Sequence, residues 1–274
     1  MRGKFGTFVK SVVLLVAFLT VLFLYTFCKS LSERNAFLEI QNLPVNDPRV
    51  LDYLRQLIIP PSTLPYVFTN RSKKYPSEFL RQLDKLFKNK NNGFFIECGA
   101  NDGEFFSNTL ELEKKGWTGL LIEAHPELAK SLLTKHRKAW FANICLSPYN
   151  NISEMQFAEA NSDWGLDGIG KLLLPDTNNM THHRLYGTVR CFPLASLMAA
   201  MDIKHVDYFS LDVEGVDLKV LKTLPFDDTL VIDYIQVEIV LVKEGQQEVT
   251  KFLKSKNYTF LFKRDFDLFY KRNS

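Results

Sequence analysis

The chain has 274 residues, of which 46% are hydrophobic, and its formal net charge is +3. This length suffices for one large domain with additional segments, and the hydrophobic fraction supports a packed core. The small net charge and the lack of a basic, aromatic-rich patch argue against a nucleic-acid partner.

Residues 11–28 predict a transmembrane helix, because they carry no charge and are flanked by Lys10 and Lys29. These 18 residues are just enough to cross a bilayer. A cleaved signal peptide is the alternative, but its apolar core is usually shorter, and no small-x-small cleavage pattern is present. Residues 1–10 are then a short tail, and the weak excess of positive charge before the span favours a cytosolic position for it.

Four Asn-x-Ser/Thr triplets follow the span, at Asn70, Asn151, Asn179 and Asn257. Such triplets are glycosylation acceptors when they face the lumen, although they also arise often by chance. Together with the span they predict a single-pass type II protein of the endoplasmic reticulum or Golgi membrane. Its main domain is expected in the lumen.

The chain has four cysteines and no Cys-x-x-Cys, which argues against a zinc ribbon or a redox dithiol. Cys28 lies at the membrane edge, and the other three cannot all pair within one chain. Because Cys98 lies in the expected ligand loop, a disulfide between Cys145 and Cys191 is the preferred pairing.

Prolines recur within residues 29–75, and this pattern is typical of a stem that connects a membrane span to a folded domain. One amphipathic helix is expected after Asp47. Its apolar positions are Val50, Leu51, Leu54 and Ile58. A clearer helix begins at Pro76 with Ser77 as its N-cap. It carries an apolar stripe of Phe79, Leu80, Leu83, Leu86 and Phe87. The folded domain is therefore expected over residues 76–274.

The organising segment runs from Phe94 to Pro126 and is typical of a strand, a loop, a helix and a second strand. The first strand ends at Glu97, and the second, residues 119–122, ends at Glu123. Between them, Gly99 and Gly103 bracket a turn, and a helix is expected over 107–115 with a stop at Gly116. This parallel βαβ unit places an acid at the carboxyl end of each strand, the edge where ligands bind in open α/β sheets.

The remainder alternates strands and helices, so we predict an α/β class with a mostly parallel sheet. Expected strands are 139–144, 155–158, 188–192, 206–211 and 232–240, with a closing antiparallel pair at 258–263 and 268–270. Expected helices are 126–136, 193–201, 216–223 and 246–254. A long polar loop is expected over 161–187.

The loop between the first two strands does not suit a nucleotide phosphate. It lacks Gly-x-Gly-x-x-Gly, and Glu97 and Glu104 flank it. An acidic loop suits a ligand with a cationic amine, a sulfonium and a ribose diol. Glu123, 20 residues beyond Gly103, is placed to accept both ribose hydroxyls. The pattern therefore favours S-adenosylmethionine over an unspecified ligand of an α/β domain.

Three segments together, residues 97–109, 121–126 and 210–221, resemble FkbM-type methyltransferase domains. The resemblance covers roughly residues 93–272, and the single N-terminal anchor makes the animal Star-like branch the most similar. It implies a class I S-adenosylmethionine-dependent methyltransferase fold, with a Rossmann-like sheet of seven strands.

The resemblance also implies roles for individual residues. Those expected to line the methionine part of the cofactor are Glu97, Gly99, Asn101 and Gly103. Glu123 is expected to hold the ribose. Residues expected beside the adenine are Ala124, His125, Asn143 and Ile144. Asp212 and Glu214 are expected to face the methyl-transfer cleft.

Active members of the family are O-methyltransferases that act on hydroxyls of sugars or related molecules. Such an enzyme positions the acceptor, and a general base removes its proton. The candidate bases are Asp212, Glu214 and Glu238. A histidine that many members carry after the strand of Glu238 is replaced here by Ile239 and Val240.

Other interpretations of these acids stay open. Asp212 is alternatively a cap for the following helix, and Glu214 with Glu238 is alternatively a divalent-metal site. No metal is the preferred expectation. His182 and His183 lie in the polar loop without nearby ligands, so they are expected to be solvated.

The sequence therefore supports two functional hypotheses. The first is a membrane-anchored S-adenosylmethionine-dependent O-methyltransferase of the secretory pathway, with a hydroxyl-bearing acceptor. The alternative is a Star-like trafficking factor that keeps the fold without turnover and has a protein cargo, a growth-factor precursor in secretory or endosomal transport. Because S-adenosylmethionine is made in the cytosol, a lumenal domain requires its import, which gives the alternative weight.

Overall fold

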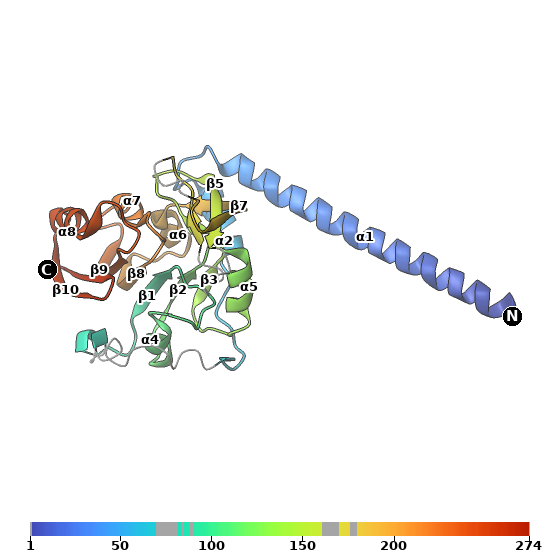
Figure 1. Ribbon diagram of the computed structural model, residues 1–274, viewed down its shortest axis with the longest axis horizontal. Coiled ribbons are helices and arrows are strands. Elements are labelled where there is room, and N and C mark those ends of the chain that lie inside the picture. Colours follow the sequence, from blue (N-terminus) through green and yellow to red (C-terminus); the bar gives the residue numbers. More distant parts are fainter. Residues whose placement is uncertain are drawn as a thin grey trace. The chain divides into compact units, whose positions relative to one another are not determined.

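The structure is a computed structural model that describes residues 2–69, 82–83, 85–87, 90–160, 170–175 and 180–273. It contains two compact units, Met1–Leu43 and Pro44–Ser274, which are described separately. Figure 1 shows the helices and strands of both.

The first unit is dominated by helix α1 (Arg2–Ile40), which extends beyond the expected span of 11–28. From Val12 to Ile40 the helix is long and apolar enough to cross a membrane. Side chains such as Leu14 and Phe23 are exposed, as expected of a helix that has lipid for its solvent. This composition is compatible with a single-pass anchor, and a signal sequence has the same properties.

The second unit begins before the expected domain boundary at residue 76. Helix α2 (Pro48–Leu57) confirms the amphipathic helix, with Asp47 accepting a hydrogen bond from the Arg49 amide at 2.9 Å. A hydrogen bond connects α2 to helix α6 (Leu194–Ala200), in which Arg55 donates to the Ala200 carbonyl at 2.9 Å. Further along, Ile59 forms an antiparallel bridge with Phe141. Residues 44–69 are thus part of the folded unit rather than a separate stem.

The helix expected from Pro76 lies largely outside the described residues, including Ser77, Phe79 and Leu80. Of its apolar stripe, Leu83, Leu86 and Phe87 are described. Leu83 and Phe87 are buried in the core, and Leu86 is partly buried against it. The Phe87 ring lies 4.9 Å from that of Trp117 and 5.6 Å from that of Tyr208. This part of the stripe therefore packs against the main sheet, as the sequence predicts.

The main sheet has seven strands in the order β10-β11-β9-β8-β1-β2-β3 (Figure 1). In chain order the strands are β1 (Phe94–Cys98), β2 (Thr118–Ile122), β3 (Trp140–Ala142), β8 (His205–Leu211), β9 (Val231–Glu238), β10 (Tyr258–Arg264) and β11 (Asp267–Arg272). The five strands from β9 to β3 are parallel, and β11 is antiparallel to both of its neighbours. The seven strands and the closing antiparallel pair are as expected.

Short helices connect these strands. They are α4 (Leu110–Lys114), α5 (Pro126–Leu133), α7 (Asp217–Lys222) and α8 (Gly245–Ser255). Helix α4 is shorter than the expected 107–115, because Ser107, Asn108 and Thr109 all donate hydrogen bonds to the Glu97 carboxylate instead of starting the helix. It stops before Gly116, whose φ of +96° is a left-handed conformation that glycine tolerates.

A second sheet of four strands is inserted between β3 and β8. Its order is β4 (Cys145–Leu146), β7 (His183–Phe192), β5 (Ser153–Ala160) and β6 (Gly170–Leu172). The strand expected over 139–144 is confirmed in a shorter form, because β3 covers Trp140–Ala142. The separate strand β4, which follows it and belongs to the second sheet, was not predicted. The expected polar loop over 161–187 was wrong in part, because β6 and the start of β7 lie within it.

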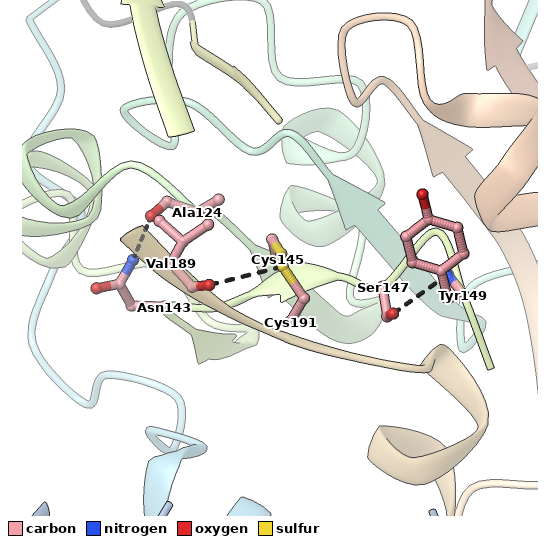
Figure 2. Close-up of a disulfide and its surroundings, with 7 residues drawn as sticks. All are labelled: Ala124, Asn143, Cys145, Ser147, Tyr149, Val189 and Cys191. Atoms are coloured by element: carbon pink, nitrogen blue, oxygen red, sulfur yellow. Dashed lines mark hydrogen bonds between the residues drawn. A yellow bond between two sulfur atoms is a disulfide. The ribbon is translucent and has the colours of Figure 1, made fainter. Parts of the chain in front are cut away.

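The disulfide between Cys145 and Cys191 is confirmed (Figure 2). The two cysteines are directly opposed in the β4–β7 register, with their Cα atoms 4.5 Å apart. Cys28 and Cys98 carry free thiols. The bridge therefore fastens the short strand β4 to the longest strand of the second sheet.

Candidate functional site

A cavity lies at the carboxyl ends of β1, β2 and β8, the edge where a ligand was expected. The main sheet contributes Cys98, Gly99, Asn101, Ile122, Glu123, Ala124, Asp212, Val213 and Glu214. The second sheet contributes Cys145, Leu146, Phe157, Gly170 and Leu172, and adjoining segments add Phe105, Phe106, Asn108, Leu128 and Ile144. The cavity is thus enclosed between the two sheets.

Gly99 allows the loop after β1 to pass tightly between β2 and β8. Its φ is +84°, and a Cβ atom there would lie 2.0 Å from the Asp212 carbonyl oxygen. The Gly99 amide donates to the Ile122 carbonyl at 3.0 Å, and the Asp212 amide donates to the Cys98 carbonyl at 3.1 Å. No side chain fits at this position, so the glycine sets the shape of the cavity floor.

Glu123 is a buried carboxylate at the wall of the cavity. One of its oxygens accepts a hydrogen bond from the Asn101 amide at 2.7 Å, and the other accepts from the His125 amide at 2.8 Å. Burial raises the pKa of Glu123 to about 7 against the opposing effect of these amides. Each oxygen keeps a further lone pair for a ligand hydroxyl.

Glu97 is buried but is not among the residues that line the cavity. Its carboxylate accepts from the Ser107 hydroxyl at 2.8 Å, the Asn108 amide at 2.5 Å and the Thr109 hydroxyl at 2.5 Å. Burial raises its pKa, while Arg137 and these hydrogen bonds act in the opposite direction. Glu97 therefore holds the loop that carries Asn108, and Asn108 itself lines the cavity.

Three further residues expected at the cofactor also lie outside the cavity lining. Gly103 has a φ of +77°, and its Cβ would lie 2.8 Å from Leu132 of α5. His125 caps α5, accepting from the Glu127 amide at 3.2 Å, and its other ring nitrogen lies 2.8 Å from the Glu159 carboxylate.

Asn143 is the third of these. Its side-chain amide donates to the carbonyls of Glu123 and Ala124, at 2.7 and 3.3 Å, and Figure 2 shows the second of these bonds. Asn143 therefore fixes the backbone of the two residues that do face the cavity.

The loop after β8 contributes two carboxylates to the cavity. Burial raises the pKa of Asp212 well above its usual range, and that of Glu214 to about 7. The Asp212 Oδ1 atom is buried without a hydrogen-bond partner among the described residues. Such an orphaned acceptor is costly unless a ligand satisfies it.

Asp217 organises this loop and was not predicted. Its two oxygens accept from the amides of Val213 and Gly215, each at 3.0 Å. Burial raises its pKa to about 7. The sequence signal is Asp217 itself, at the first position of α7 and two residues after a glycine, where a carboxylate caps free amides.

Glu238 lies at the end of β9 but is not a lining residue. Its Oε1 accepts from the Val240 amide at 2.9 Å, and its Oε2 is buried without a partner in the described part of the chain. Burial raises its pKa to about 8, and the neighbouring acids Asp217 and Glu214 act in the same direction.

Among the described residues, a compact group of three potential metal ligands is formed by His205, Asp207 and Asp233, away from the acids after β8. There the Asp207 carboxylate already accepts from the Lys90 ammonium and, at 2.7 Å, from the Phe94 amide. Lys90 thus supplies the positive charge at this group.

Arg137 stabilises the loop between β1 and α4, a role that was not predicted from the sequence. It is buried, with Nε 3.0 Å from a Glu113 oxygen and Nη1 2.6 Å from the Gly103 carbonyl oxygen. It also donates to the hydroxyls of Ser107 and Thr109, at 3.2 and 3.3 Å. In the sequence it stands in a basic run, His136-Arg137-Lys138, which is typical of a solvated surface.

The donors and surfaces of the cavity fit S-adenosylmethionine. Three carboxyl groups, those of Glu123, Asp212 and Glu214, are suited to a ribose diol and to cationic groups. Apolar side chains suited to a planar base complete the wall, namely Ile122, Leu128, Ile144, Leu146 and Phe157. The unpartnered Asp212 oxygen is an acceptor ready for a ligand donor.

The seven-stranded sheet with antiparallel β11, together with this acidic cavity at the carboxyl edge, defines a class I S-adenosylmethionine-dependent methyltransferase fold. The family model of the methyltransferase FkbM domain matches residues 97–260. The chain belongs to this family, and its cofactor is S-adenosylmethionine. The FkbM resemblance predicted from the sequence is confirmed.

Solved structures with a similar fold include M. capricolum TrmK in complex with S-adenosyl-homocysteine, with 14% identity over 72% of this chain and 69% of that one, and a TM-score of 0.36. Methanococcus jannaschii fibrillarin has 11% identity over 67% of each chain and a TM-score of 0.37. Magnesium protoporphyrin IX methyltransferase from Synechocystis PCC 6803, with bound SAM, has 10% identity over 87% and 97%, and a TM-score of 0.36. A comparison with curated proteins finds no match.

Proposed function

We propose that this protein is a membrane-anchored S-adenosylmethionine-dependent O-methyltransferase of the secretory pathway. The observation that carries the proposal is the set of three carboxyl groups, of Glu123, Asp212 and Glu214, that face one cavity at the carboxyl edge of the sheet. The unpartnered oxygen of Asp212 supports a ligand with hydrogen-bond donors at this place.

Individual residues then have definite tasks. When bound, S-adenosylmethionine supplies a methyl group on a sulfonium, ready for in-line transfer to an oxygen. Glu123, oriented by two backbone amides, accepts the ribose hydroxyls. Asp212 accepts from the donors of the methionine part, and the positive charge of the bound cofactor would favour the ionised form of this buried acid.

Glu214 is the proposed general base for the acceptor hydroxyl. A base with a pKa near the working pH combines availability with proton affinity, and the pKa of Glu214 is raised to about 7. Glu238, which does not line the cavity, is instead proposed to act on Asp212 and Glu214 through its charge state. No histidine follows β9, since Ile239 and Val240 occupy those positions.

Replacement of Glu123 by alanine is expected to weaken S-adenosylmethionine binding at least tenfold. Hydrogen bonds to a charged group contribute about 1.5–3 kcal/mol, which corresponds to roughly a 10- to 150-fold change in affinity. The measurement is isothermal titration calorimetry of the full chain in detergent micelles. Glu127→Ala, an exposed glutamate of α5 paired with Lys130, is the matched control and should bind like the wild type.

If the wild-type chain gives no heat of binding, the methyltransferase proposal fails. The Star-like trafficking role, without turnover, would then be the better account. If Glu123→Ala binds as tightly as the wild type, the ribose assignment fails while the activity proposal stands.

The lumenal, type II arrangement is the second part of the proposal. The apolar helix α1 supports an anchor with a cytosolic N-terminus, in the endoplasmic reticulum or Golgi membrane. The Cys145–Cys191 disulfide supports an oxidising compartment, because disulfides are rare in the cytosol. Asn151 and Asn257, the described acceptor asparagines, are exposed, while Asn70 and Asn179 lie outside the described residues.

Glycosylation tests this arrangement. When the full chain is made in cells with a secretory pathway, an N-glycosidase should increase its electrophoretic mobility, and Asn151→Gln should remove part of that shift. The neighbouring Asn150→Gln, which leaves the acceptor triplet intact, should not. A wild-type chain whose mobility the glycosidase leaves unchanged would contradict the lumenal assignment.

A further inference from the structure

Four large apolar side chains are exposed on the loops that follow β1, β9 and β10. They are Phe106, Val240, Leu241 and Phe266, with exposed fractions of 53%, 53%, 42% and 60%. We call this set the apolar rim. Isolated exposed apolar residues are common, but a group of them around a binding cavity is a sign of an interaction surface.

Close contacts connect the rim to the loop that carries Glu214. Phe106 lines the cavity together with Glu214. Gly215 follows Glu214 directly, and a Cβ on it would lie 2.8 Å from the carbonyl oxygen of Leu241 and 3.1 Å from its Cβ. Leu241 is therefore packed beside the proposed base.

Phe266 joins the rim through the backbone. The Ile239 amide donates to the Phe266 carbonyl at 3.0 Å, which places the β10–β11 turn against the residues that precede Leu241. Val240 lies between these two contacts in the chain. Leu241, and through the Ile239 backbone also Phe266, therefore lies beside the loop that carries Glu214.

Charged side chains of both signs accompany the rim. Lys243 and Lys263 are exposed within three residues of Leu241 and Phe266, with Glu244 and Asp265 among their neighbours. Exposed apolar side chains beside lysines, whose long stems are apolar, suit the boundary between lipid headgroups and acyl chains. The same chain carries an apolar helix long enough to span a membrane, which would hold the domain at high effective concentration near lipid.

We propose that the apolar rim docks on a lipid surface, and that the acceptor is a hydroxyl carried by a lipid. The inference rests on the proposed methyltransferase function. In the reaction the lipid hydroxyl gives its proton to Glu214, and its oxygen forms a bond to the methyl carbon. The carbon–sulfur bond breaks with its electron pair remaining on sulfur, so the sulfonium charge is neutralised.

Docking is tested without any cofactor. The full chain, in a Cys28→Ser background, is reconstituted into phosphatidylcholine–phosphatidylserine vesicles that contain nitroxide-labelled lipid. Phe266→Cys and Leu241→Cys are labelled in turn with an environment-sensitive fluorophore, while the buried Cys98 stays unlabelled. Leu185→Cys on β7 is the matched control, because Leu185 is 56% exposed in the same tethered domain.

Labels at 266 and 241 are expected to lose about half or more of their fluorescence to the nitroxide lipid, because rim side chains enter the interface. The label at 185 should lose little. Equal quenching at all three positions, or none at 266, would overturn the proposal.

A second measurement addresses the acceptor. The double variant Leu241→Ser/Phe266→Ser should transfer about tenfold less radiolabelled methyl from S-adenosylmethionine to extractable vesicle lipid, with calorimetric cofactor affinity unchanged. Transfer to a water-soluble sugar with no effect of the double variant would overturn the lipid assignment. A chain that binds no S-adenosylmethionine would instead remove the methyltransferase proposal and leave the quenching result to stand by itself.

Discussion

Gly99→Ala is expected to destabilise the domain by roughly 3–5 kcal/mol and to abolish measurable S-adenosylmethionine binding. The added Cβ would lie 2.0 Å from the Asp212 carbonyl oxygen, which is backbone and has no alternative rotamer. Relief of that overlap requires β1 and β8 to separate at the cavity floor. Denaturant unfolding of the full chain in micelles measures the stability change, and calorimetry measures the loss of binding.

Gly245→Ala isolates the steric part of this effect. Gly245 has a φ of +71°, close to the +84° of Gly99, but nothing lies within 4 Å of a Cβ there. It should cost only the left-handed conformation, about 1–2 kcal/mol, and leave cofactor binding intact. If the two variants lose the same stability, backbone conformation rather than the close approach to Asp212 determines the requirement for glycine.

Arg137→Met is expected to cost about 3–5 kcal/mol of unfolding free energy, because it leaves the buried Glu113 carboxylate without its cation. It also removes donors from the Gly103 carbonyl and from the hydroxyls of Ser107 and Thr109. Unfolding in denaturant is the measurement, and a weaker affinity for S-adenosylmethionine should accompany it, since these hydroxyls hold Glu97 and the cavity loop.

Arg137→Met/Glu113→Gln is the companion variant. It removes both charges, so it should recover part of the stability lost in the single variant. A double variant less stable than Arg137→Met would contradict the buried-pair explanation. Lys114→Met, which removes a partly exposed partner of Glu111, should stay within about 1 kcal/mol of the wild type.

The parts of the fold that could be predicted are those where local pattern and tertiary role agree. β1 and β2 are short apolar runs that end at the acids Glu97 and Glu123, and the cavity forms at those ends. The Cys145–Cys191 pairing followed from elimination of Cys98. In these places no distant partner was needed to interpret the residues.

The second sheet shows where prediction from the local sequence pattern fails. β6 and the start of β7 are polar, and Leu185 is exposed, so their pattern is that of a loop. They are strands because β5 supplies backbone partners along Ser153–Ala160, a pairing that hydrophobic periodicity does not encode. The expected role of Glu97 differs for a similar reason. Its carboxylate accepts from the hydroxyls of Ser107 and Thr109 and from the Asn108 amide, so it holds the loop and does not line the cavity.

The disulfide has a consequence for when the cavity becomes complete. Cys145 lines the cavity, and its disulfide partner Cys191 lies on β7. This wall of the cavity is therefore linked covalently to the longest strand of the second sheet, by a bond that forms only under oxidising conditions. A newly made chain still in reducing surroundings would carry the main sheet and its carboxylates but an unfastened wall. Completion of this cavity wall would then depend on oxidation of the Cys145–Cys191 pair.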